Sequence, residues 1–218
     1  MEKHEARMMM EGCLKALIAQ SGYLAGLNTV QECMKDEDVR AFLGHGLLDE
    51  IMPVMDLPRE EVNALAMEIC GEMEKPDLDI PLLSLCQNGA RVWEQNVLPV
   101  MEKYLNREGV IPSCLSFSLS CLMMYFSGAR KNAQGAFEGL RAGEPYIASE
   151  DEAVLSAFAR LSPDMPPEML AYAVLSDWDI WERNLREVEG LADKIADQLR
   201  DLQILGLKEA MKRSYEKN

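Results

Sequence analysis

Acidic side chains are the most numerous groups in this chain that could do chemistry. Thirty-seven of the 218 residues are Asp or Glu, and close pairs such as Glu60 with Glu61 or Asp177 with Asp179 could divide acid and base roles. A glycosidase-like pair needs one carboxyl group in an apolar pocket that raises its pKa. No pattern singles out such an acid, and close pairs are expected by chance in so acidic a chain. We interpret most of them as solvated surface.

The two histidines, His4 and His45, are the next candidates. His45 lies in FLGHGLLDE, between two glycines and beside an apolar helix. It could act as a general base, but the sequence shows no partner to orient its ring, which favours a structural role. Neither histidine has a second ligand at helical spacing, so no zinc site is expected.

Glycines in GYLAG and GHG could suggest a phosphate-binding turn. A dinucleotide fingerprint needs G-x-G-x-x-G between a strand and a helix, followed by an acidic residue that binds the ribose. The sequence shows no such βαβ pattern. We therefore expect no cofactor site in this chain.

The six cysteines have no C-x-x-C spacing and fall within apolar helical patterns, which is typical of reduced thiols in a core. The segment 1–7 is highly charged and does not resemble a signal peptide, so a cytoplasmic location is expected. The net charge of −15 disfavours nucleic acid and anionic membranes as partners, because both require basic surfaces.

The elements that must position these side chains all follow helical spacing. Apolar residues recur every three or four positions, and the sequence shows no strand-like alternation. Thr29 with Glu32 forms a capping-box pattern, and Asp36 can begin the next helix. We predict an all-α multi-helix bundle that forms a single domain over 1–218. Its expected helices include residues 5–23, a helix that begins within 56–61 and runs to 73, and residues 81–86, 92–105, 113–126, 151–161, 167–175 and 188–211.

Two segments of this bundle stand out. Residues 113–126 are apolar on all sides and too short to span a membrane, which predicts a buried central helix. Residues 129–150 are polar and rich in glycine, which predicts a loop or a flap, with one helical turn within 132–140.

Several blocks, in order, resemble the C-terminal helical domain of the long-chain mannitol dehydrogenases, and in particular the tagaturonate reductase (altronate oxidoreductase) and fructuronate reductase branch. The resemblance covers nearly the whole chain. It rests on the blocks GYLAGLNTVQECMKDEDVRAFL, LLDEIMPVMDLPREEV, VLPVMEKYLNREGVIPSCLSFSLSCLMMYFSG, GEPYIASED and VLSDWDIWERNLREVEGLADKIADQLRDLQILGLKEAM.

The resemblance implies a catalytic Lys, Asn and His near the start of this domain, with Lys as acid/base and the other two positioning the substrate oxygen. In this sequence the three positions hold Ala6, Glu11 and Leu14. Shifting the register by one residue still supplies neither Asn nor His, because the positions then hold Arg7, Gly12 and Lys15. We expect no catalytic residues here.

A second family patch binds the substrate through an Arg-His pair and a Lys. Here it corresponds to the segment 75–80 and to 88–92, in which Asn88 is retained. Asp79 and Ile80 replace the Arg-His pair, and Val92 replaces the Lys. Since hexuronates are anions, Asp79 in place of Arg would repel them. Asn88 is the one residual substrate-binding candidate.

The resemblance also implies an NAD-binding Rossmann domain, which this sequence does not contain. We expect a stand-alone or truncated substrate domain that is non-catalytic alone and has a binding or oligomerisation role. The alternative is one half of a split hexuronate reductase, completed by a separate Rossmann chain that brings NAD. Expected partners are a second copy or a cognate dehydrogenase subunit, through the face around Met8, Met9 and Met10. A small sugar acid is a further expected ligand.

Overall fold

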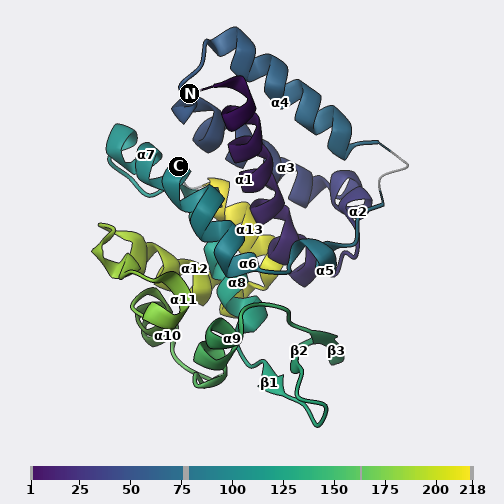
Figure 1. Ribbon diagram of the computed structural model, residues 1–218, viewed down its shortest axis with the longest axis vertical. Helices are drawn as coiled ribbons and strands as arrows, with labels where there is room; N and C mark the ends of the chain where they lie inside the picture. The colour runs from purple at the N-terminus through teal and green to yellow at the C-terminus, as the bar shows by residue number, and fades with distance from the viewer. Residues whose placement is uncertain (1, 76–78, 163, 217–218) are drawn as a thin grey trace.

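The chain folds into a bundle of helices with a small sheet at one end (Figure 1). The computed structural model describes residues 2–75, 79–162 and 164–216. The predicted all-α class is confirmed, apart from the small sheet. The helical elements are α1 (Lys3–Leu24), α2 (Val30–Lys35), α3 (Glu37–His45), η1 (Gly46–Ile51), η2 (Met52–Val54), α4 (Arg59–Met73), α5 (Leu82–Leu85), α6 (Gly89–Val92), η3 (Trp93–Val97), α7 (Leu98–Glu108), α8 (Ser113–Phe126), α9 (Glu152–Ala159), α10 (Pro167–Leu175), α11 (Trp178–Trp181), η4 (Leu185–Glu187), α12 (Leu191–Leu205) and α13 (Leu207–Glu216).

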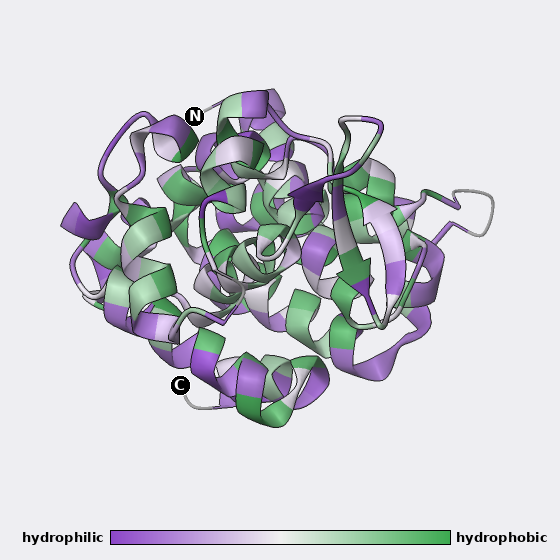
Figure 2. Ribbon diagram, turned by 90° about the horizontal axis from the view of Figure 1, so that it is seen from below, coloured by the Kyte–Doolittle hydropathy of each residue, from purple (hydrophilic) through white to green (hydrophobic). Residues whose placement is uncertain are grey.

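Helix α8 lies at the centre, as the sequence predicts. Of its 14 residues, only Met124 is not fully buried. It packs against α1 on one side and against α12 and α13 on another. The outer helices carry both hydrophobic and hydrophilic residues, so in Figure 2 green and purple segments alternate along them.

One glutamine of α12 bonds to buried polar groups of three serines on α8. Gln198 Nε2 donates to the Ser113 carbonyl at 2.9 Å and to Ser116 Oγ at 3.0 Å. Ser120 Oγ donates to Gln198 Oε1 at 3.1 Å. Because a buried polar group without a partner is destabilising, this network explains how a serine-rich helix can occupy the core.

Two π-helical segments each precede a proline. The segment η1 ends just before Pro53, and η3 ends just before Pro99, which occupies the second position of α7. Proline has no N–H to donate to the preceding turn, and a widened π turn accommodates that loss. The expected single helix over 92–105 is therefore a continuous run of α6, η3 and α7.

The segment 129–150, predicted as a loop or flap with a helical turn, instead contains a three-stranded antiparallel sheet. Its strands, in spatial order, are β1 (Arg130–Lys131), β2 (Phe137–Arg141) and β3 (Glu144–Ile147). The strands are too short for a clear alternation, and the turns between them use Gly135 and Gly143 at positive φ. The prediction of a loop is therefore wrong for the residues that form these strands. A flap-like motion of the segment 129–150 stays a prediction.

The predicted helix over 188–211 is also corrected, because it is two helices. Gly206 separates α12 from α13 with φ of 77° and ψ of 171°, a conformation that is essentially restricted to glycine. Apolar spacing continues on both sides of Gly206, so periodicity alone does not reveal the break. The turn lets α13 fold back against α3 and α8.

Candidate functional site

The three positions that the resemblance assigns to catalysis lie along α1. Ala6 and Leu14 are buried, with 0% and 2% of their surfaces exposed, and Glu11 is half-buried. The two buried positions are aliphatic and have no titratable group to move a proton. Helix α1 forms where the sequence predicts it, with its apolar face against α8.

Arg7 occupies the centre of an ion-pair network at this place. Its guanidinium lies 2.7 Å from Glu11, 2.6 Å from Glu68 and 2.8 Å from Glu72. The first contact is within α1, and the other two reach across to α4. Arg7 donates hydrogen bonds to the carboxylates of Glu68 and Glu72, and these bonds hold the pKa of Arg7 above its usual range. In the shifted register, Gly12 faces Asn96 and Lys15 is exposed.

The predicted substrate-binding patch, residues 75–80 and 88–92, lies only partly beside the predicted catalytic positions on α1. Pro76, Asp77 and Leu78 lie outside the described residues. Asp79 is exposed, and Ile80 is half-buried. In the segment 88–92, Asn88 is the N-cap of α6 and Val92 is its last residue.

Asn88 itself lies at the surface in the left-handed region, with φ of 52°. Its N–H donates to the carbonyl of Ser149 at 3.0 Å. Val92 packs against the core. Neither Asn88 nor Val92 lines the cavity that contains Glu11 and Leu14, so this cavity does not join Asn88 to the positions that the resemblance assigns to catalysis.

A cavity of about 190 Å³ opens between α1, α4 and α5. It brings together Glu11, Leu14 and Lys15 with Ile80, so both sequence patches contribute to it. Of the ten described residues that line it, seven are apolar. These ten are Glu11, Leu14, Lys15, Ile18, Val30, Ile69, Glu72, Met73, Ile80 and Leu85.

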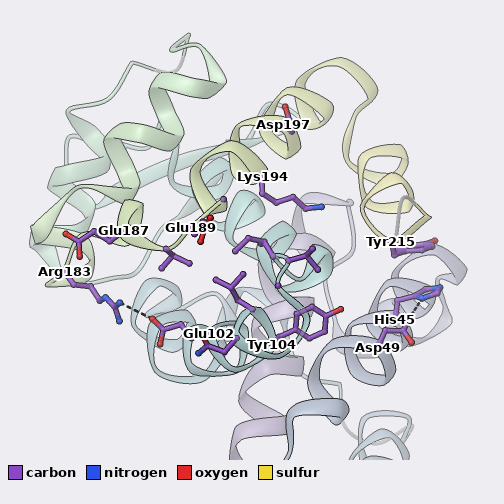
Figure 3. A pocket seen from close by; sticks show the side chains of 17 residues that line it. His45, Asp49, Glu102, Tyr104, Arg183, Glu187, Glu189, Lys194, Asp197 and Tyr215 are labelled. Carbon is purple, nitrogen blue, oxygen red and sulfur yellow. Dashed lines mark hydrogen bonds and ion pairs between the residues drawn. The ribbon is translucent and has the colours of Figure 1, made fainter.

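A larger open cleft, about 1620 Å³ in volume, shares no lining residue with that cavity. It lies between α3, α7, α12 and α13 (Figure 3). His45 Nδ1 lies 2.8 Å from Asp49 Oδ2, and the ring stacks on Tyr215 with centroids 4.5 Å apart. The sequence pattern did not indicate a partner that orients the ring of His45. The structure shows that Asp49 is this partner. Its position four residues after His45, one helical turn along the chain, is the sequence signal that could have identified it.

Glu50 is a buried acidic residue that the sequence pattern did not single out. It is 1% exposed, and its carboxylate accepts the N–H of Cys114 at 2.7 Å and of Leu115 at 2.8 Å. Burial raises its pKa to about 7, against the backbone N–H groups that lower it. Pro112, at the N-cap of α8, has no side chain that can accept these bonds, so Glu50 caps the helix from 64 residues away in sequence.

Three further findings on the described residues concern metal ions, membrane-spanning helices and nicotinamide dinucleotides. No group of three or more His, Cys, Asp or Glu among them is placed to hold a metal ion. None of the helices described combines the length and hydrophobicity needed to cross a membrane. In the described ranges the one sheet is antiparallel, so this part of the chain does not fit the parallel βαβ cradle of a nicotinamide dinucleotide.

Comparison with known proteins agrees with this architecture. Altronate oxidoreductase of Escherichia coli O139:H28 is 29% identical over 209 residues, and so is that of Escherichia coli O1:K1; the match covers 94% of this chain and 41% of either relative. The chain thus spans about two fifths of the length of these curated relatives.

Two solved structures share the fold. Pseudomonas fluorescens mannitol 2-dehydrogenase, in a ternary complex with NAD and D-mannitol, superposes with a TM-score of 0.78 at 15% identity, covering 99% of this chain and 41% of that one. A substrate-free D-sorbitol dehydrogenase gives 0.67 at 14% identity, covering 94% and 40%. The family described as the mannitol dehydrogenase C-terminal domain matches residues 8–203, and this chain belongs to that family.

Proposed function

We propose that this domain serves in binding or assembly and does not supply the catalytic groups of a mannitol- or altronate-type dehydrogenase. One observation carries the proposal. The positions expected to hold the catalytic Lys, Asn and His hold Ala6, Glu11 and Leu14, and Glu11 is engaged by Arg7 at 2.7 Å. Hydride transfer from an alcohol, or to the corresponding carbonyl group, needs a group that takes up or supplies the hydroxyl proton, and neither Ala6 nor Leu14 provides one.

The test is an activity assay on the natural-length protein from its host gene. NAD-dependent oxidation of altronate and of mannitol, and NADH-dependent reduction of tagaturonate and fructuronate, are followed at 340 nm. Escherichia coli altronate oxidoreductase is the positive control. We expect no turnover above the protein-free rate. Turnover at a rate similar to the control, with any of the four substrates, would refute the proposal.

The proposed partner is a second copy of this chain or a cognate dehydrogenase subunit. Exposed methionines support a contact surface, because Met8 on α1 and Met67 on α4 are 57% and 77% exposed. The predicted methionine face is narrower than the sequence suggested, since Met9 is half-buried and Met10 is fully buried. Sedimentation velocity, with and without a candidate subunit, tests both forms of assembly.

A split reductase is the second candidate. It is favoured by the coverage of the relatives, which are oxidoreductases about two and a half times as long as the matched segment. In this arrangement a separate Rossmann chain would bring NAD, because the described residues do not fit it. Mixing the two chains and observing tagaturonate or fructuronate reduction would favour this candidate over the non-catalytic one.

The proposal has two further parts: the domain binds a small sugar acid, and the protein is located in the cytoplasm. At the position of Asp79 the resemblance expects an Arg that binds an anionic sugar. Because Asp79 is itself an anion, it lowers the expected affinity for a sugar acid. Six free thiols suit a reducing compartment. A thermal-shift screen with altronate and gluconate tests for sugar acids, because a bound ligand stabilises the native state by mass action.

A further inference from the structure

The cavity between α1, α4 and α5 has fixed walls. The N–H of Val30 donates to the carbonyl of Ile80 at 3.0 Å, and the N–H of Leu82 donates to the carbonyl of Asn28 at 2.8 Å. Gln31 Nε2 donates to the carbonyl of Met73 at 3.4 Å, at the end of α4. These bonds attach residues 80–82 to Asn28 and to Val30, the first residue of α2, and attach the end of α4 to Gln31 of α2. They hold the two walls of the cavity together.

The inside of the cavity is aliphatic. Leu14, Ile18, Val30 and Ile69 are each no more than 4% exposed, and Met73, Ile80 and Leu85 complete the apolar lining. A cavity of about 150 Å³ lined by such side chains stays dry and binds benzene. At about 190 Å³, this one has room for an aliphatic group of about six heavy atoms.

This lining excludes a polyol. Each hydroxyl group buried without a hydrogen-bond partner loses about 1–3 kcal/mol, and mannitol carries a hydroxyl on every carbon. Among the described residues of the lining, the polar ones are Glu11, Lys15 and Glu72. The cavity thus differs in ligand chemistry from a site that holds a sugar alcohol.

The polar end of the cavity carries more negative than positive charge. Arg7 and Lys15 face the carboxylates of Glu11, Glu68 and Glu72, and Lys15 Nζ is 4.0 Å from Glu11. The carboxylates of Glu11 and Glu72 offer acceptor lone pairs beyond those used by Arg7. The whole chain has a net charge of −15, which attracts cations and repels anions.

We propose that this cavity binds a small aliphatic monoamine, with its hydrocarbon part against Leu14, Ile69 and Ile80 and its ammonium group at Glu11 and Glu72. The inference rests on the proposed function, because it assigns a ligand class to the same remodelled site. The ligand size follows from the cavity volume, and the head group follows from the charges at the opening.

The experiment uses 3-methylbutylamine as the probe, with the methyl groups of Ile and Met labelled with ¹³C. We expect the amine to shift the methyl signals of Ile18, Ile69 and Met73 and to leave Ile195 in α12 unchanged. The isosteric alcohol 3-methylbutan-1-ol should bind more weakly, 3-methylbutanoate more weakly still, and D-mannitol not at all. Unchanged cavity signals with the amine, or tighter binding of the carboxylate or of mannitol, would overturn the inference.

Variants separate the two halves of the site. I80F fills the opening and should abolish binding, while I147F, at an exposed site on β3, should not. E72Q should weaken the amine about threefold, as expected for a partly exposed ion pair, and leave the alcohol unaffected. An equal loss for both ligands in E72Q would contradict the ammonium assignment. Failure of amine binding leaves the activity result unaffected, so the two proposals fail separately.

Discussion

Arg7 Nη2 lies 2.8 Å from Glu72 Oε2, and this ion pair joins α1 to α4 beside the apolar cavity. The two residues are 65 positions apart in the sequence. Together with the contacts to Glu11 and Glu68, the pair occupies the place at which the family resemblance expects catalytic chemistry. An electrostatic contact between helices therefore lies beside the positions that the resemblance assigns to catalysis.

Replacing Arg7 with Ala should loosen α4. The change leaves Glu11, Glu68 and Glu72 as three nearby carboxylates that repel one another, so we expect a lower melting temperature and faster amide exchange in α4. Raising the salt concentration should reduce the difference, because salt screens partly exposed charges. Arg91→Ala is the matched control, since Arg91 makes one longer contact, 3.8 Å from Glu182. Equal effects of the two variants would contradict a special role for Arg7.

Glu50 should make stability depend on pH. Burial raises its pKa from 4.5 to about 7 in the folded state, so the native state binds a proton that the unfolded state releases between these values. This contribution is complete below pH 4.5 and is lost as the pH rises through 7. Its size is about 3 kcal/mol at most.

Urea unfolding of the wild type and of E50Q between pH 5 and pH 8.5 measures this contribution. The free energy of unfolding of the wild type should fall relative to that of E50Q as the pH rises. E61Q, which changes an exposed glutamate in the first turn of α4, should follow the wild type. Parallel curves for the wild type and E50Q would show that Glu50 does not titrate in this range.

Gln198→Leu should destabilise the centre of the bundle. It removes the Gln198 hydrogen bonds to the Ser113 carbonyl and to Ser116 Oγ inside the core, and each hydrogen bond lost costs about 0.5–1.5 kcal/mol. Gln203→Leu changes an exposed residue of the same helix and should have little effect. Chemical denaturation of both variants measures the difference, and a stable Q198L would mean that water replaces the amide.

Gly206→Ala should be destabilising although a new Cβ would meet nothing within 4 Å. The backbone φ of 77° with ψ of 171° is unfavourable for any residue with a side chain, by about 1–3 kcal/mol. Gly71→Ala is the opposite case, because Gly71 lies inside α4 and also has open space. It should stabilise the protein by about 0.5–1 kcal/mol. Thermal unfolding distinguishes the two.

Local signals predicted most of the helices. Apolar periodicity located α1, α8 and α10, and Thr29 caps α2 by accepting the N–H of Glu32 at 3.2 Å. Both signals act within a few residues, so the sequence displays them directly. The strands and the break at Gly206 were missed, because strands of two to five residues and a glycine between two apolar patterns do not disturb the periodicity.

The sequence by itself supplied Ala6, Glu11 and Leu14 at the positions where the family resemblance predicts a catalytic Lys, Asn and His, and the loss of catalysis stays a prediction. Only the tertiary structure decided what those positions contact. Arg7 meets Glu68 and Glu72, and Glu50 caps α8, because helices far apart in the sequence dock against each other. Charge interactions and burial depend on distances in the folded chain, and those distances are set by the packing of all the helices together.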